Sequence, residues 1–267
     1  VNREIGFTRG TFSLRNSDVT LVSNETRTAD VAPITNMANA SIRYAGSGKF
    51  AVQRFIHNPT GTRSWRLLTA PLDPASAPSI NEAFQEAVVN PDRLNPNGSG
   101  GIYNPWPGYG THITGPSGTY SLTNGFDQGT NSASLLYAGP GVATWPSVAS
   151  TKSVKVTDQP GWMLFVRGDR GFVIGSQYNP SQNTTLEPKG RINTGDVVRP
   201  IVAGSQVVGN PYPSAISLLN VNVAGTNGGN VNYYVWDPKM YTSYAQPGKW
   251  VTFAGIGSSF VQTTSAS

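Results

Sequence analysis

The chain has only two histidines, and neither stands in a pattern that supports catalysis or metal binding. His57 and His112 are far apart in the sequence and fall in predicted loops. A zinc-protease helix carries two histidines four residues apart on one face, and a common class of serine hydrolases carries a Gly-x-Ser-x-Gly turn. Neither motif occurs, and cysteine is absent. We therefore expect no catalytic residue, no metal site and no cofactor, and interpret both histidines as surface residues.

Two glutamates have a spacing that suits acid–base chemistry. Glu82 and Glu86 are four residues apart on a predicted helix and therefore share one face. A glycoside hydrolase needs two carboxylates about 5–10 Å apart across a cleft, whereas a charged helix face usually contacts solvent. A glycoside hydrolase is therefore the second alternative function. The aspartates could bind Ca²⁺ but are better interpreted as turn caps: Asp127, Asp169, Asp196 and Asp237.

An aromatic loop is the candidate ligand-binding site. Tyr103, Trp106 and Tyr109 lie in a connection rich in Gly, Pro and Asn over residues 90–118. An exposed flat ring can stack on a sugar, so a carbohydrate-binding or adhesion module is the first alternative function. We prefer the interpretation that these rings cover the sheet as a lid, because large aromatic side chains are rarely left fully exposed.

The tripeptide Arg167-Gly168-Asp169 is the motif that integrins recognise in some matrix proteins. Three residues recur often by chance, and a Gly-Asp pair is ordinary turn chemistry. We interpret this copy as part of a turn.

Composition excludes several classes of protein. The 267 residues include 30 Gly and 20 Pro, and only 12% are charged, which favours many turns between short strands over long helices. The net charge is +5, but the basic residues are scattered and no recognition motif accompanies them, so we expect no nucleic-acid partner. No apolar run reaches the roughly 20 residues of a membrane span. No signal peptide is visible at the start of the sequence, and we interpret Val1 as a processed start.

Alternating apolar residues predict an all-β fold, an antiparallel, jelly-roll-like β-sandwich with long loops rich in Gly, Pro and Asn. Residues 40–44 and 50–56 are predicted to pair as a hairpin, and residues 161–167 to form a central strand. A Ser-x-x-Glu capping box at Ser79 predicts one short helix near 79–89, about three turns long. We see no internal repeat. A weak seam suggests a β segment over 1–57, within the same sandwich or as a strand-exchange lobe, followed by the main sandwich over 58–267.

Proline-containing corners are predicted to end strands. Proline cannot donate to a sheet ladder, so the apolar strand that begins at Gln206 must stop at the first corner, and the strand that begins at Val231 must stop at the second. The residues assigned to these structural corners are Asn210, Pro211, Tyr212 and Pro213 in the first, and Trp236, Asp237 and Pro238 in the second.

Taken in order, several segments resemble a module of large secreted or cell-surface Bacteroidota proteins, those exported by the type IX route with a C-terminal sorting domain. The segments are GTFSL at 10–14, GKFAVQRFI at 48–56, WRLLTAP at 65–71, GFD at 125–127, GWMLFVRGDR at 161–170, VGNPYPS at 208–214 and YVWDP at 234–238. The resemblance implies an extracellular, β-rich, adhesin-like or scaffold module and brings no catalytic residues with it.

These observations together predict a non-catalytic structural module of an extracellular or cell-surface assembly, such as a filament or adhesin subunit. Such proteins usually continue beyond a segment like 257–262, so the chain is expected to be a fragment or a processed subunit. A sheet that lacks a strand exposes an unpaired edge. The expected partners are therefore other copies of the chain or adjacent modules, joined through strand edges or terminal strands, with surface glycans as the partner in the first alternative.

Overall fold

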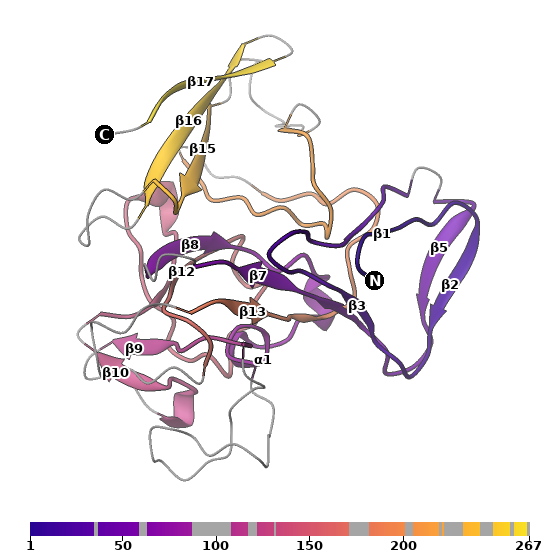
Figure 1. Ribbon diagram of the computed structural model, residues 1–267, viewed down its shortest axis with the longest axis horizontal. Coiled ribbons are helices and arrows are strands. Elements are labelled where there is room, and N and C mark those ends of the chain that lie inside the picture. Colours follow the sequence, from indigo (N-terminus) through magenta and orange to yellow (C-terminus); the bar gives the residue numbers. More distant parts are fainter. Residues whose placement is uncertain are drawn as a thin grey trace.

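The computed structural model describes residues 1–34, 37–58, 63–86, 108–116, 122–130, 132–170, 182–200, 205–218, 221, 232–240, 248–256 and 259–265. Short strands dominate these residues, and the helical elements among them are single turns (Figure 1). The predicted all-β fold is therefore confirmed. The strands form several small sheets of two or three strands each.

The first six strands form two similar turns of chain stacked in parallel, which we call the N-terminal stack. The first turn comprises β1 (Glu4–Ile5), β2 (Gly10–Leu14) and β3 (Val19–Leu21), and the second comprises β4 (Asp30–Val31), β5 (Ala40–Tyr44) and β6 (Phe50–Val52). Each strand of the first turn pairs in parallel with its counterpart in the second. The register sets apolar residue beside apolar residue, with Phe12 opposite Ile42 and Leu21 opposite Val52, so parallel stacking buries one continuous row.

This stack corrects three predictions. Residues 40–44 do not form a hairpin with 50–56, the pairing here is parallel, and the chain does contain a structural repeat. The reason lies in the connection from Tyr44 to Phe50, which packs on the equivalent connection of the first turn. The amide of Gly48 donates to the carbonyl of Arg15 at 2.7 Å, and a Cβ on Gly46 would lie 2.4 Å from the same oxygen. Because Gly46 and Gly48 have no side chains, the two connections, which we call the first and second arcs, can pack closely against each other.

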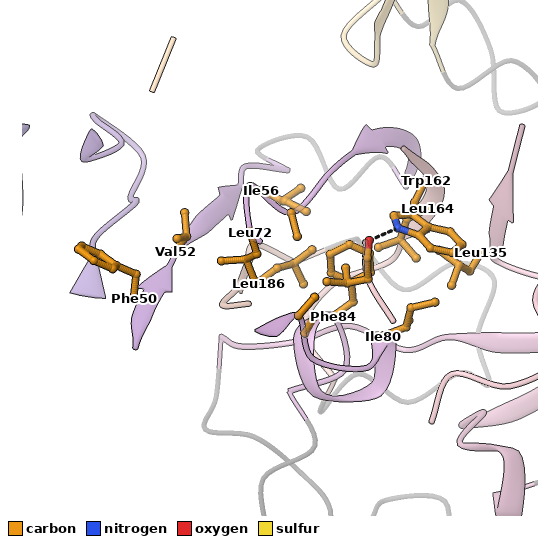
Figure 2. Packing of buried hydrophobic residues seen from close by; sticks show 14 of the residues in the cluster. Phe50, Val52, Ile56, Leu72, Ile80, Phe84, Leu135, Trp162, Leu164 and Leu186 are labelled. Carbon is orange, nitrogen blue, oxygen red and sulfur yellow. Dashed lines mark hydrogen bonds between the residues drawn. The ribbon is translucent and has the colours of Figure 1, made fainter. Parts of the chain in front are cut away.

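The main sheet of the central body is antiparallel, as predicted. Its main sheet has the order β11 (Leu135–Tyr137), β12 (Trp162–Val166) and β8 (Ser64–Leu68). The predicted central strand is β12, where Trp162 and Leu164 are fully buried. The indole of Trp162 donates to the carbonyl of Val156 at 2.7 Å (Figure 2), so this ring is both packed and hydrogen-bonded.

Three further pairings complete the body. Two are antiparallel: β7 (Arg54–Ile56) with β13 (Thr184–Leu186), and β14 (Lys189–Gly190) with β6. The third, β9 (Thr114–Pro116) with β10 (Gln128–Thr130), is parallel. Because β6 pairs with both β3 and β14, it joins the N-terminal stack to the body.

The predicted helix is present but shorter than expected. The helix α1 (Ile80–Ala83) begins with the capping box that the sequence indicates, in which Ser79 and Glu82 exchange hydrogen bonds. Its apolar residues Ile80 and Ala83 are buried. The helix ends after one turn, and the backbone of Glu86 has a left-handed φ of 49°, which turns the chain away from the helical path. Residues 87–89 of the predicted helix lie outside the described residues.

One hydrophobic cluster connects the N-terminal stack with the body. Figure 2 shows it running from Phe50 and Val52, through Phe84 and Leu186, to Trp162. The predicted division at residues 57 and 58 remains a prediction, but side chains from both of its sides share this cluster.

The last three described strands form a separate antiparallel unit, which we call the C-terminal sheet. It has the order β15 (Asn232–Asp237), β16 (Lys249–Ile256) and β17 (Ser259–Ser265), and it stands apart from the rest of the strands at the top of Figure 1. The indole of Trp236 donates to the carbonyl of Trp65 at 2.8 Å, and the charge of Asp237 interacts with Arg66 of β8, so both residues link the sheet to the body. Val251 is buried within it but does not belong to the main cluster.

The first predicted corner is tightly hydrogen-bonded. The side-chain oxygen of Asn210 accepts from the amide of Tyr212 at 3.0 Å, and the Tyr212 hydroxyl donates to the carbonyl of Gly195 at 2.6 Å. The carbonyl of Pro213 accepts from Val31 at 3.1 Å, which ties the corner to the N-terminal stack. The prediction of a strand before this corner is wrong, because residues 205–210 pair with no strand among the described residues.

The second corner closes strand β15. The Asp237 carboxylate accepts from the amide of Lys239 at 2.8 Å, and the Asp237 carbonyl accepts from Met240 at 3.4 Å. Pro238 lies between them, so the chain turns where the sequence indicates.

Candidate functional site

The predicted aromatic loop falls largely outside the described residues, which include Tyr109 but neither Tyr103 nor Trp106. Tyr109 is held by the body. Its backbone carbonyl accepts from the amide of Arg170 at 3.2 Å, and its hydroxyl lies 3.5 Å from the amide nitrogen of Gln53. The ring is half-buried. Tyr109 therefore packs against the sheet, as a covering side chain does.

The Arg-Gly-Asp tripeptide points into the protein. The Asp169 carboxylate is buried and accepts from the amide of Gly108 at 2.6 Å. The Arg167 guanidinium lies 4.8 Å from the ring centre of Phe165, and burial lowers the pKa of Arg167 to about 10, with the nearby charge of Arg63 acting in the same direction. A partner could not reach the carboxylate without moving the chain.

The two histidines lie in different environments, and the prediction of surface histidines is wrong for one of them. His57 is half-buried, stacks against Phe55 and lies 3.5 Å from the carboxylate of Glu25. His112 is only 2% exposed and lies 3.6 Å from the Asp127 carboxylate. The sequence around His112 contains Thr111, Ile113 and Thr114, whose side chains are also buried, so the segment crosses the interior.

A buried ion pair was not predicted, and it is the strongest electrostatic feature of the body. The Arg170 guanidinium donates twice to one carboxylate oxygen of Asp127, at 2.9 and 3.1 Å, and also to the carbonyl of Gln85. The other Asp127 oxygen accepts from Gln85 at 2.7 Å and from the amide of Ile113 at 3.0 Å.

These donors control the charge of Asp127. Burial alone would raise its pKa, but the Arg170 charge, His112 and the Ile113 amide outweigh burial and lower the pKa to about 2. Asp127 is therefore ionised and fully hydrogen-bonded, which is the pattern of a structural group. In the sequence, the only sign of this ion pair is that Asp127 and Arg170 each lie two residues after a glycine, at 125–127 and 168–170, in a chain with few charged residues.

The two glutamates predicted to share a helix face are separated. Glu82 is exposed and its carboxylate accepts from the amide and hydroxyl of Ser79, at 2.9 and 2.8 Å. Glu86 is buried beyond the end of the helix and accepts from the amide of Glu187. Burial is the main cause that raises the pKa of Glu86 to about 8. The Glu187 charge raises it further, and the Glu187 amide, Lys189 and Arg170 lower it.

The network around Glu187 shows what holds Glu86 in place. Glu187 accepts from the side-chain amide of Gln53 at 2.6 Å and pairs with Lys189 at 3.1 Å. The Gln53 side-chain oxygen in turn accepts from the amide of Ser23 at 3.2 Å. These contacts connect α1, β14 and the N-terminal stack, so the carboxylates fix elements relative to one another.

Among the described residues, the buried carboxylates of Asp127, Asp169 and Glu86 therefore accept hydrogen bonds from the protein itself. No three His, Asp or Glu side chains converge there in a way that could hold a metal ion. Of the four aspartates considered for Ca²⁺, Asp127, Asp169 and Asp237 accept protein hydrogen bonds and Asp196 is exposed. Within the same residues, no helix has the length and apolar character needed to cross a bilayer.

Comparison of the chain with protein-family models, with curated proteins and with solved structures finds no match.

Proposed function

We propose that the chain is a non-catalytic structural module of an extracellular or cell-surface assembly, and that copies associate through strand edges. The observation that carries this proposal is the C-terminal sheet, whose two outer strands each have one edge without a partner among the described residues. An unpaired edge presents a row of backbone donors and acceptors to any other strand.

The sequence of this sheet does little to protect its edges. Natural edge strands are usually blunted by lysine, proline or inward-pointing charges. Strand β17 (SFVQTTS) contains none of these, and strand β15 (NYYVWD) has a single charge at its last residue. On β15, Tyr234 is 53% exposed and Val235 is 45% exposed. Adding a strand here would pair the edge and cover apolar side chains, which is the mode of β-strand addition.

The N-terminal stack offers a second open edge. Strand β2 pairs with β5 alone among the described residues, and a two-stranded sheet is marginal by itself. In Figure 1, β2 and β5 project from a different side of the molecule than the C-terminal sheet. Open edges on two separate sides of the molecule suit a subunit that contacts two neighbours.

The extracellular location and the filament or adhesin role rest on the resemblance to Bacteroidota type IX-secreted modules and on the weakly charged composition. The charged groups of the body support a non-catalytic role, since Asp127, Arg170 and Glu86 are occupied by structural contacts. A glycosidase would need two accessible carboxylates facing a cleft, and Glu82 and Glu86 do not provide that arrangement.

Charge placed on the β15 edge tests the proposal. Tyr234→Lys with Val235→Lys should block strand addition, and the matched control is Val198→Lys with Val208→Lys, two exposed valines outside the sheet. Sedimentation and negative-stain microscopy should show oligomers for the wild type and the control, and association at least about tenfold weaker for the edge variant. A wild type that remains monomeric at high concentration, or an edge variant that assembles like the control, would overturn the proposal.

A further inference from the structure

A groove with two cationic side chains in its lining lies between the connection from Tyr44 to Phe50 and the short helix η1 (Pro74–Ser76). It has a volume of about 280 Å³, near the small end of the range for ligand pockets, about 300–1,000 Å³. Three side chains carry its chemistry: Ser47, Lys49 and Arg191. All three are exposed, and none of the predicted site residues lines the groove.

The walls of the groove are fixed by hydrogen bonds. On the arc, the amide of Lys49 donates to the Asp18 carboxylate at 2.8 Å, and the amide of Gly48 donates to Arg15. On the other side, the Ser76 hydroxyl donates to the carbonyl of Asp73 at 3.2 Å and accepts from the amide of Arg191 at 2.8 Å. A site whose walls are already held loses little entropy when a ligand binds.

An aromatic ring positions one of the two cations. The Arg191 guanidinium lies 5.2 Å from the ring centre of Tyr44, a cation–π contact. The Tyr44 hydroxyl accepts from the amide of Ile192 at 3.0 Å, and the ring meets Phe50 edge-on at 6.4 Å. The planar guanidinium is therefore oriented at the groove, where it can bind a carboxylate or sulfate with two parallel hydrogen bonds.

The charge at the groove is available for a ligand. Among the described residues, neither Lys49 nor Arg191 forms an ion pair. The nearby carboxylates already have protein donors. Asp18 accepts from the Lys49 amide and lies 3.9 Å from Lys189, and Asp73 accepts from the amide of Ala75. Two cations without ionic partners among the described residues therefore line the same groove as Ser47.

We propose that this groove binds an acidic sugar unit of a polysaccharide. Its anionic group contacts Arg191 and Lys49, and its hydroxyl groups bond to Ser47. The groove is larger than a free phosphate requires, and the two cations in its lining favour an anionic ligand over an apolar side chain. The proposed ligand is a hydroxylated ring that carries one anionic group, which is a carboxylate or a sulfate. The groove contains no residue of the C-terminal sheet, so ligand binding should be independent of assembly through that sheet.

Calorimetry with three probes tests the inference: oligogalacturonate for the carboxylate, sulfated dextran for the sulfate, and neutral dextran as the control. Lys49→Gln with Arg191→Gln should weaken binding of the acidic probe by about tenfold or more. The matched control, Arg27→Gln with Arg43→Gln, removes the same charge at exposed positions outside the groove and should stay within about twofold. Whichever acidic probe binds identifies the anion.

A third variant separates the groove from general electrostatic attraction. Ser47→Trp keeps both cations but fills the groove, so it should also abolish binding, and thermal unfolding should verify that each variant folds. The inference is overturned if neither acidic probe binds, if neutral dextran binds equally, if both charge variants lose equal affinity, or if Ser47→Trp binds like the wild type. Repeating the titration on the monomeric edge variant keeps the result separate from assembly.

Discussion

The N-terminal stack and the C-terminal sheet are both built from strands of mostly uncharged residues, but they are attached to the protein in different ways. In the stack, β6 contributes Phe50 and Val52 to the main hydrophobic cluster and pairs with strands on both sides. Among the described side chains of the C-terminal sheet, none belongs to that cluster, and the sheet is linked to the body through the indole of Trp236 and the charge of Asp237 beside Arg66.

The difference has a physical origin in how each unit satisfies its backbone. The backbone of one parallel turn of chain can pair only with that of another turn. The two turns of the stack are therefore held together by their strand register and by the packing of the two arcs. An antiparallel meander of consecutive strands completes most of its hydrogen bonds locally. The C-terminal sheet can therefore form without the body, and regions with few contacts to a core open at low free energy. We expect the stack to unfold with the body and the C-terminal sheet to open separately.

The largest effect should come from truncating the anchor of the stack. Phe50 is fully buried, so Phe50→Ala should lower the free energy of unfolding by about 3–5 kcal/mol. Val251→Ala, in the C-terminal sheet, should speed hydrogen exchange in β15 and β16 while leaving the main denaturation midpoint nearly unchanged. Urea denaturation and exchange mass spectrometry measure both. If Val251→Ala shifts the main transition as far as Phe50→Ala does, the two regions are one cooperative unit.

The second effect is a pH dependence confined to the stack and the body. The pKa of Glu86 is raised from 4.5 to about 8 in the folded protein, so the folded state binds more protons than the unfolded state between these values. The contribution of Glu86 to stability should therefore be fully present below about pH 4.5 and be lost as the pH rises toward 8. Glu86→Gln should remove most of this slope, gaining on the order of 2–4 kcal/mol at pH 8.

Exchange in β13 and β14, corrected for the intrinsic rate, should follow the same trend, while β15 and β16 should not. A Glu86→Gln variant with the same slope as the wild type would exclude Glu86 as its source. Asp127 acts in the opposite sense. Its pKa is lowered to about 2, so its contribution is present above the unfolded pKa of about 4 and is lost as the pH falls toward 2.

The sequence predicts the elements of this protein better than their partners. A continuous apolar run identifies β12, the capping box identifies the start of α1, and proline identifies the corners, because each of these signals is local. Parallel pairing of residues 10–14 with 40–44 is not local. It depends on matched apolar residues far apart in sequence and on glycines whose role is visible only when Arg15 lies against them.

The same limit applies to the candidate sites. His112 looks like a loop residue because Thr and Gly surround it, but it is buried by elements distant in sequence. Glu86 continues the helical spacing from Glu82, and only the left-handed backbone after Phe84 turns it inward. The groove likewise joins Lys49 to Arg191 through packing of the stack on the body. Spacing along one element could not indicate contacts made between elements.

A smaller effect should come from weakening the attachment of the C-terminal sheet. Trp236→Phe removes the hydrogen bond to Trp65 but keeps an aromatic ring against Trp250, which should cost about 1 kcal/mol locally. Exchange in β15 and β16 should rise about fivefold, with little change in β8 or β12. Trp250→Phe is the control, because it alters the same ring pair and leaves the hydrogen bond from Trp236 to Trp65 in place. Equal effects of the two substitutions would show that ring packing, and not the hydrogen bond, attaches the sheet.

The smallest effect should come from the first corner, which joins the stack to the segment leading toward the C-terminal sheet. Pro211 fixes its own φ and limits the unfolded chain, so Pro211→Ala should lower stability by only about 0.5 kcal/mol. The Asn210 and Tyr212 hydrogen bonds remain, so the corner should keep its shape. Pro33→Ala, at an exposed proline, serves as the matched control. Because the corner contacts the stack through Pro213, the loss should appear in the main unfolding transition. A loss confined to the C-terminal sheet would instead place the corner on the other side of the boundary between the two regions.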